Sequence, residues 1–196
     1  MQKGLVEVYT GNGKGKTTSA FGLVLRALGR GKRVIIFQFI KSSDFPSGEV
    51  IALKKAFPEV EIIQGGSGRF IKGSPTEEDI SMAKNLYKKV VQSASSGEYD
   101  IVIVDEIFPA YNVGLITLEE ILELIEKKAD NTELVLTGRG APEEVISLSH
   151  LVTEMREIKH PYKEGVKARM GIEYLNGGDS IEWVFYACTP YPPPFC

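Results

Sequence analysis

Short apolar, β-branched runs alternate with longer amphipathic runs along most of this chain, and this alternation limits the folds that it can adopt. Runs such as residues 34–40 (VIIFQFI) are apolar on both faces, as is typical of strands in a parallel sheet that helices cover on both sides. The pattern predicts an α/β fold with a mostly parallel, doubly wound sheet. The expected strands are residues 5–10, 34–40, 60–63, 100–105, 133–137 and 151–155, and the expected helices are residues 17–29, 48–56, 75–96, 117–128 and 142–148.

Several expected helices begin or end with capping residues. Ser74 followed by Pro75 predicts a helix that Ser74 caps and in which Pro75 takes the first position. Thr117 and Glu120 have the spacing of a capping box. Gly29 is a suitable stop for the first helix. These signals favour helices where the hydrophobic periodicity already places them.

The pattern changes after about residue 156, where a polar loop of mixed charge begins. Residues 171–174 and 181–186 then have the pattern of two short strands in a β-hairpin, and a stiff proline-rich tail follows them. We expect one domain over residues 1–175, with residues 176–196 as a C-terminal extension of the same domain.

Composition and charge exclude several classes of protein. The chain has 196 residues, 43% of them hydrophobic, and a formal net charge of −3. That length supports one ordinary core, and the acidic balance argues against a general nucleic-acid binder. The longest apolar runs fall well short of the ~18 residues that a membrane span needs. Without a secretory signal, and with only Cys188 and Cys196 in the tail, the chain is expected to be cytoplasmic, with no nucleic-acid or membrane partner.

A glycine-rich run, residues 11–18 (GNGKGKTT), lies between the first expected strand and the first expected helix. In that position it predicts a phosphate-binding loop, because glycines let backbone N–H groups approach phosphate and a helix N-terminus adds further donors. Lys16 can contact the outer phosphates and the Thr17 hydroxyl can bind Mg²⁺. One position departs from the standard spacing, which places a glycine where this chain has Thr10. A glycine-rich turn without a ligand remains the alternative.

Two acidic residues, Asp105 and Glu106, close the apolar run 101–104. P-loop proteins place such a carboxylate near the Mg²⁺ ion or its water. Acidic residues after a strand are often only solvated, but the phosphate loop favours the metal-binding interpretation here. Ligands of doubly wound sheets bind beyond the carboxyl ends of the strands. We therefore expect the loops that follow the strands to meet at one site.

These residues together resemble the ATP:corrinoid adenosyltransferases of the CobA/BtuR/CobO family, which have a P-loop NTPase fold of RecA-like type. The likeness covers roughly residues 4–174. Besides the phosphate loop, it rests on residues 34–41, 105–107, 137–142, 152–156, 159–161 and 165–174.

The resemblance implies that the chain transfers the 5′-deoxyadenosyl group of ATP to the cobalt of a reduced, Co(I) corrinoid and releases triphosphate. It also implies a homodimer and a reductase partner such as a flavoprotein. The expected catalytic residues are Lys16, Thr17 and Glu106, and the expected Mg²⁺-binding residues are Thr17, Asp105 and Glu106. The residues expected to bind ATP or the corrinoid are Gly11, Asn12, Gly13, Lys14, Gly15, Lys16, Thr17, Thr18, Arg26, Lys41, Phe70, Arg139 and His160.

Two other functions stay open from the sequence. One is a P-loop ATPase of RecA-like type, and the other is a protein that binds nucleotide or corrinoid without turnover. The second arises because relatives commonly carry a Phe-x-Trp pair after the third strand, whereas this chain has Phe70 without a tryptophan beside it. The products distinguish the three functions: triphosphate from the transferase, phosphate from the ATPase, and neither from the carrier.

Overall fold

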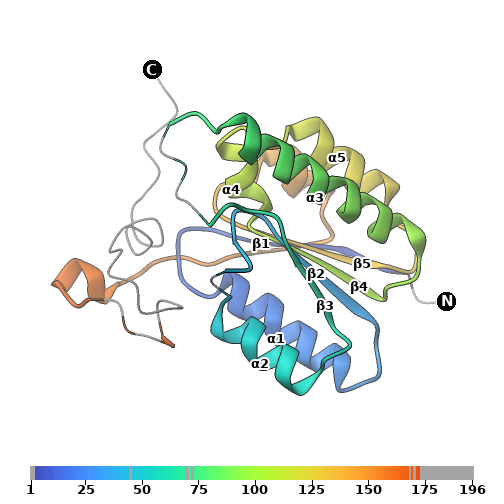
Figure 1. Cartoon of the computed structure of the whole chain (residues 1–196), viewed down its shortest axis with the longest axis horizontal. Coiled ribbons are helices and arrows are strands. Elements are labelled where there is room, and N and C mark those ends of the chain that lie inside the picture. Colours follow the sequence, from blue (N-terminus) through green and yellow to red (C-terminus); the bar gives the residue numbers. More distant parts are fainter. Residues whose placement is uncertain are drawn as a thin grey trace.

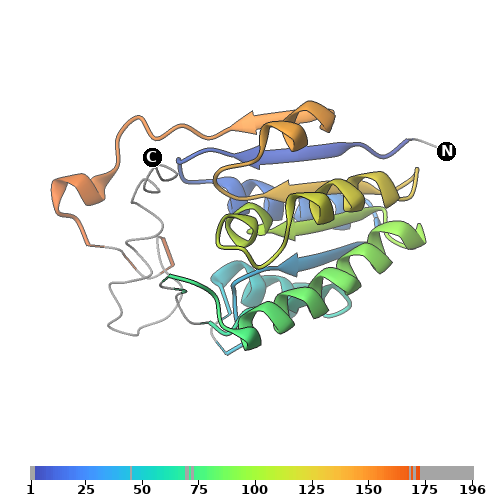
Figure 2. The same ribbon diagram turned by 90° about the horizontal axis from the view of Figure 1, so that it is seen from above.

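The computed structural model describes residues 3–44, 46–68, 71, 73–167, 169 and 171–172 (Figures 1 and 2). The expected C-terminal hairpin, the proline-rich tail, and the boundary between residues 175 and 176 lie outside the described residues. Among the described residues, no helix is both long and apolar enough to cross a bilayer.

One parallel sheet of six strands forms the centre of the molecule, in the order β3-β2-β4-β5-β1-β6. This arrangement confirms the mostly parallel sheet that the sequence predicts. The strands are β1 (Val6–Thr10), β2 (Val34–Gln38), β3 (Glu61–Gln64), β4 (Ile101–Asp105), β5 (Glu133–Thr137) and β6 (Leu151–Glu154).

Helices cover both faces of the sheet (Figure 1). One face carries α1 (Lys16–Leu28) and α2 (Gly48–Ala56). The other carries α3 (Glu77–Ser96), α4 (Ile107–Asn112), α5 (Leu118–Lys127) and α6 (Glu143–Leu148). A short 3-10 helix, η1 (Pro161–Glu164), lies in the segment that projects beyond β6 (Figure 2).

The alternation of side chains along each strand divides the core into two layers. In β2, Ile35 and Phe37 are buried on the α3 side, while Val34 and Ile36 are buried on the α1 side. This is the arrangement expected of a strand that is apolar on both faces. It also fixes the face toward which the last residue of each strand points.

The observed start of α3 corrects one prediction, and the observed start of α5 confirms another. Helix α3 begins at Glu77, and its cap is Thr76 rather than Ser74. The Thr76 hydroxyl accepts a hydrogen bond from the Asp79 N–H, and the Asp79 carboxylate accepts one from the Thr76 N–H. These two hydrogen bonds satisfy two backbone N–H donors at the start of the helix. Ser74 lies too far before Glu77 to cap the helix in this way. The box at Thr117 is present as predicted.

Two short elements were not expected from the sequence, namely α4 and η1. Helix α4 has only six residues and contains Pro109, so it is too short to show a 3.6-residue periodicity. Strand β2 also ends earlier than expected, at Gln38, because the chain turns sharply at Ile40, which has φ 66°.

The capping assignment predicts different effects for two neighbouring substitutions. Thr76→Ala removes a side-chain hydrogen bond at the start of α3 and should lower the free energy of unfolding by about 1 kcal/mol. Ser74→Ala is the matched control and should leave stability nearly unchanged. Chemical denaturation of the two variants measures both effects, and a larger loss for Ser74→Ala would show that the helix starts where the sequence alone suggested.

Candidate active site

The last residues of four neighbouring strands form a row of polar side chains, which we call the polar row: Gln64, Gln38, Asp105 and Thr137. In the sheet register Gln38 lies opposite both Gln64 and Asp105, and Thr137 ends β5 beside β4. Side chains two residues earlier in these strands pack in the α1 layer, so the polar row faces α1 as well. It therefore lies next to the phosphate loop, where α1 begins.

Asp105 is the centre of the polar row and is fully buried. Its carboxylate accepts hydrogen bonds from the Thr17 and Thr137 hydroxyls at 2.8 and 2.6 Å, both on Oδ1. Oδ2 accepts from the Gln38 amide and the Lys41 ammonium, each at 2.8 Å. Burial works to raise the pKa of Asp105, but the charge of Lys41 and these hydrogen bonds hold it below its usual value. The group is an ionised, fully bonded carboxylate.

Binding of Mg²⁺ by Thr17, Asp105 and Glu106 stays a prediction, and this geometry bears on the part that each residue could take in it. A carboxylate has about four lone-pair positions, and the four donors to Asp105 occupy them. Thr17 donates its only hydroxyl proton to Asp105, which leaves its oxygen lone pairs for a cation. The arrangement favours Thr17 and Glu106 for direct contact with the metal, while Asp105 orients Thr17.

The phosphate loop has the form expected of an anion-binding helix start. Gly15 caps α1 with φ 121°, a backbone conformation that favours glycine. Lys16 is only 7% exposed, and its ammonium donates to the carbonyl oxygens of Gly11 and Gly13 at 2.8 and 2.9 Å. Burial, together with the nearby charge of Arg139, lowers the pKa of Lys16 to about 8.

Gly11 and Gly13 are needed for a reason that the sequence did not reveal. The backbone that follows β6 lies against them, with the Gly13 N–H donating to the Met155 carbonyl at 2.6 Å and the Met155 N–H donating to the Thr10 carbonyl at 2.8 Å. A Cβ on Gly11 or Gly13 would lie 2.5 or 2.7 Å from that same Met155 oxygen. Thr10, which replaces the first glycine of the standard phosphate loop, also has a role, because its hydroxyl accepts a hydrogen bond from the Ala141 N–H.

Glu106 is held in a strained backbone conformation immediately after Asp105. Its φ of 60° is left-handed, which is uncommon for a residue other than glycine and is often found at functional sites. The Thr137 hydroxyl, which donates to Asp105, also accepts from the Glu106 N–H at 3.2 Å. Burial and the charge of Asp105 raise the pKa of Glu106, and the charges of Lys41 and Lys16 oppose this rise.

Lys41 reaches Asp105 through a tight turn at the end of β2. The Lys41 N–H donates to the Phe39 carbonyl at 2.7 Å, and Ile40 between them has φ 66°. A γ-turn with positive φ is rare and strained, especially at a β-branched residue. Burial works to lower the pKa of Lys41, but the charges of Asp105 and Glu106 outweigh it and raise the pKa above its usual value.

The other predicted binding residues are less closely tied to this cluster. Arg26 lies in the last turn of α1, about 14 Å along the helix axis from Thr17. The start of the helix, where the phosphate loop lies, is therefore distant from its backbone, and its binding role stays a prediction. Phe70 lies outside the described residues.

Three residues of the phosphate loop, Asn12, Lys14 and Thr18, are exposed. The Lys14 ammonium donates to the Ile172 carbonyl at 2.6 Å, which returns the projecting segment to the loop. His160 is half-buried just before η1, in that same segment.

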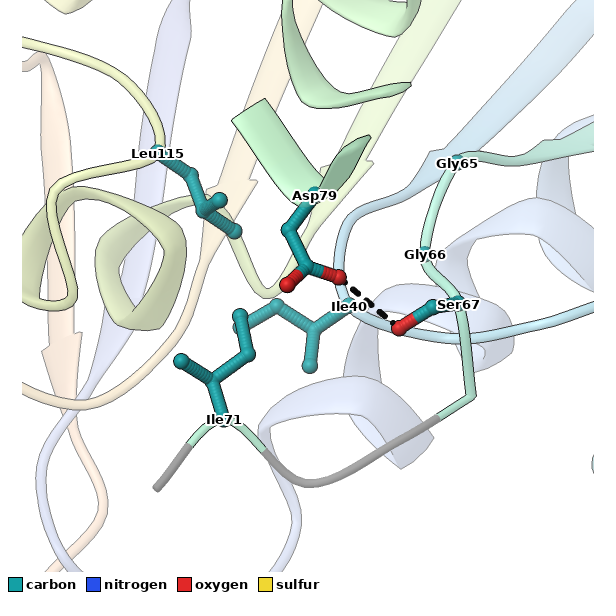
Figure 3. A pocket seen from close by; sticks show the side chains of 7 residues that line it. All are labelled: Ile40, Gly65, Gly66, Ser67, Ile71, Asp79 and Leu115. Carbon is teal, nitrogen blue, oxygen red and sulfur yellow. Dashed lines mark hydrogen bonds between the residues drawn. The ribbon is translucent and has the colours of Figure 1, made fainter. Parts of the chain in front are cut away.

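A small pocket lies on the α3 side of the same sheet edge (Figure 3). The Ser67 hydroxyl donates to the Asp79 carboxylate at 3.0 Å across its rim. The Gly66 N–H donates to the Lys41 carbonyl, so the pocket adjoins the turn that carries Lys41. Apart from the Ser67–Asp79 pair, its walls are apolar side chains and glycine backbone. The residues that line it are Ile40, Gly65, Gly66, Ser67, Ile71, Asp79 and Leu115.

The sequence placed residues 38–44 among the segments expected at the ligand edge of the sheet, but it gave Gln38 no role there and did not identify Gln64 or Met155 as parts of the site. A usable signal existed for the two glutamines, because each is the last residue of an apolar strand and precedes a sharp turn or a glycine. No local signal marks Met155, whose contact with the phosphate loop depends on the pairing of β1 with β6.

The sheet order and the phosphate loop define a P-loop nucleotide-binding fold. The structure is similar to that of a KaiC-like protein from Pyrococcus horikoshii OT3, with a TM-score of 0.53 and 16% sequence identity; the match covers 79% of this chain and 74% of that one. At that identity the likeness concerns the fold alone.

Sequence comparisons define the family. The model of the family described as ATP:corrinoid adenosyltransferase BtuR/CobO/CobP matches residues 2–174. The corrinoid adenosyltransferase of Escherichia coli (strain K12) is 32% identical over 88% of this chain and 87% of its own length. That of Pseudomonas aeruginosa (strain PAO1) is 35% identical over 88% of this chain and 85% of its own length. This chain belongs to the ATP:corrinoid adenosyltransferase family.

The lowered pKa of Lys16 predicts that nucleotide binding is linked to proton uptake. Near pH 9 Lys16 is neutral in most of the free protein, whereas the bound triphosphate should favour its charged form. Binding at about pH 9 should therefore take up a proton at Lys16. At about pH 7 Lys16 is already charged, and binding should take up none there. Titration calorimetry in two buffers of different ionisation enthalpy measures the uptake. Lys16→Arg is the matched control, since arginine stays charged throughout. Proton uptake by Lys16→Arg equal to that of the wild type would show that the proton is not bound at Lys16.

Proposed function

We propose that this chain transfers the 5′-deoxyadenosyl group of ATP to the cobalt of a reduced corrinoid, with triphosphate as the leaving group. The observation that carries the proposal is the cluster at the carboxyl edge of the sheet. There the phosphate loop and Lys16 lie within electrostatic reach of Arg139 and Glu106, and Thr17 is fixed by Asp105. In a family of corrinoid adenosyltransferases, such a cluster suits the triphosphate of ATP.

The proposed reaction needs stabilisation of charge more than it needs proton transfer. The electron pair of Co(I) forms a bond to C5′ of ATP, the C5′–O bond breaks with its electrons, and triphosphate leaves while cobalt becomes formally Co(III). No proton moves in this step, so a general base is not required. Negative charge grows on the leaving oxygen, which donors already in position can stabilise.

Each residue of the cluster has a specific part in this proposal. The loop N–H groups other than that of Gly13, which donates to Met155, hold the phosphates together with Lys16, and Arg139 adds a second positive charge nearby. A bound Mg²⁺ ion would neutralise further charge on the triphosphate, held by the Thr17 hydroxyl and the Glu106 carboxylate. Asp105 keeps Thr17 in place.

The pocket of Figure 3 has room for little more than a water molecule, so the corrinoid would lie over the outer surface of the sheet edge rather than inside the pocket. There it would bring cobalt to C5′ with water excluded. A homodimer, a reductase that supplies Co(I) and a cytoplasmic location belong to the same proposal.

One observation favours ATP hydrolysis as a second candidate. Glu106 follows Asp105 directly and has a raised pKa, which would suit a base that activates water. The similar fold of the KaiC-like protein does not decide between the two reactions, because one fold hosts many chemistries.

Anaerobic incubation with ATP, Mg²⁺ and chemically reduced cobalamin tests the proposed function. We expect the visible spectrum to change to that of an alkylated corrinoid, with one triphosphate released per corrinoid. Lys16→Ala should lower the rate by at least about 100-fold, because it removes a charge that contacts the leaving group. Lys88→Ala, an exposed lysine of α3, is the control and should act like the wild type. Release of phosphate without adenosylation would favour the ATPase instead.

A further inference from the structure

Gln38 differs from the other donors to Asp105 in how it is held. Its side chain is fully buried, and its Nε2 donates to Asp105 Oδ2 at 2.8 Å. Its Oε1 accepts a hydrogen bond from Gln64 Nε2 at 3.0 Å. Because Asp105 can only accept and Gln64 presents a donor, the Gln38 amide has one orientation that satisfies both neighbours. Gln64 therefore locks the amide from the side of the edge strand.

The position of this pair follows from the sheet. Gln38 and Gln64 are register partners in β2 and β3, and Gln38 is also the register partner of Asp105 in β4. Strands in a parallel sheet are about 4.8 Å apart, so successive side chains of the row can hydrogen-bond directly. No water or loop is needed to connect the edge strand with the carboxylate.

Gln38 and Gln64 together limit rotation of the Asp105 carboxylate. Oδ1 carries the two hydroxyls and Oδ2 carries Gln38 and Lys41. Lys41 lies on a flexible stem and is partly exposed, whereas Gln38 is buried and held at both ends. Loss of Gln38 would free a lone pair on Oδ2 and let the carboxylate turn away from Thr17.

We propose that Gln38, locked by Gln64, is a positioning residue for Mg·ATP: it fixes Asp105 so that Thr17 presents its oxygen lone pairs to the metal of the bound nucleotide. This inference deepens the proposed function and rests on the same phosphate loop. It assigns a function to two strand residues, the last of β2 and the last of β3, whose hydrogen bonds lead to Thr17 through Asp105.

The test measures ATP affinity by calorimetry with excess Mg²⁺ and again with EDTA. In the wild type Mg²⁺ should strengthen binding. Gln38→Met, which has nearly the same shape, should reduce that strengthening by about tenfold, as is usual when a residue that supports a metal ligand is removed. Affinity in EDTA should stay unchanged, because the loop contacts to phosphate remain. Gln92→Met, at an exposed glutamine of α3, is the matched control and should match the wild type.

A second variant keeps the test decisive if Gln38→Met does not fold. Gln64→Met leaves the bond from Gln38 to Asp105 but unlocks the amide, so it should weaken Mg·ATP binding in the same direction and by less. Unchanged strengthening by Mg²⁺ in whichever variant folds would overturn the proposal, as would a wild type that binds ATP equally with and without Mg²⁺.

The readout separates this inference from the proposed function. Calorimetry involves no corrinoid, so a wild-type protein that fails to adenosylate cobalamin leaves the expected effect of Gln38→Met intact. Conversely, an active transferase in which Gln38→Met changes neither Mg²⁺-dependent affinity nor the Mg²⁺ concentration for half-maximal rate contradicts the inference alone.

Discussion

A single buried carboxylate organises the functional edge of this protein. Burying an ionised Asp105 is costly unless its charge is paired and its lone pairs are bonded. The structure meets both conditions with donors from separate elements: Thr17 from α1, Gln38 from β2, Thr137 from β5, and Lys41 from the turn after β2. Because each donor belongs to a different element, satisfying Asp105 also fixes those elements relative to one another.

The same interaction explains why strained backbone persists beside it. Ile40 and Glu106 both have positive φ, and each such residue costs on the order of 1–3 kcal/mol. Ile40 directs Lys41 to Asp105, and the N–H of Glu106 bonds to the hydroxyl that Thr137 donates to Asp105. The hydrogen bonds around the carboxylate offset the strain, and the strain in turn places Lys41 and Glu106 at the edge where a triphosphate would bind.

The sequence was sufficient for the parts of the structure that depend on local patterns. Hydrophobic periodicity predicted the strands and the longer helices, and the phosphate loop and Asp105-Glu106 were recognisable from their neighbours. The expected cap of α3 was wrong, because the sequence pointed to Ser74 whereas Thr76 caps the helix. The binding role expected of Arg26 stays a prediction, and this residue lies in the last turn of α1, away from the start of that helix.

What the sequence could not supply was the order of the strands. Gln38 and Gln64 become partners only because β2 lies between β3 and β4, and Met155 reaches Gly13 only because β6 lies beside β1. These pairings join residues that are far apart in the chain, and they decide which polar strand ends meet. The pair Gln38–Asp105 is therefore a property of topology, although each residue was visible in the sequence.

If the site holds triphosphate as a leaving group, as we propose, the bond that breaks is C5′–O. ATP labelled with ¹⁸O at the oxygen between C5′ and the α-phosphorus tests it most directly, with reduced cobalamin as the acceptor and mass spectrometry of the products. In the proposed transfer the label leaves with triphosphate, and the adenosyl group on cobalt carries none. Label retained in a nucleoside diphosphate, with unlabelled phosphate released, would contradict it.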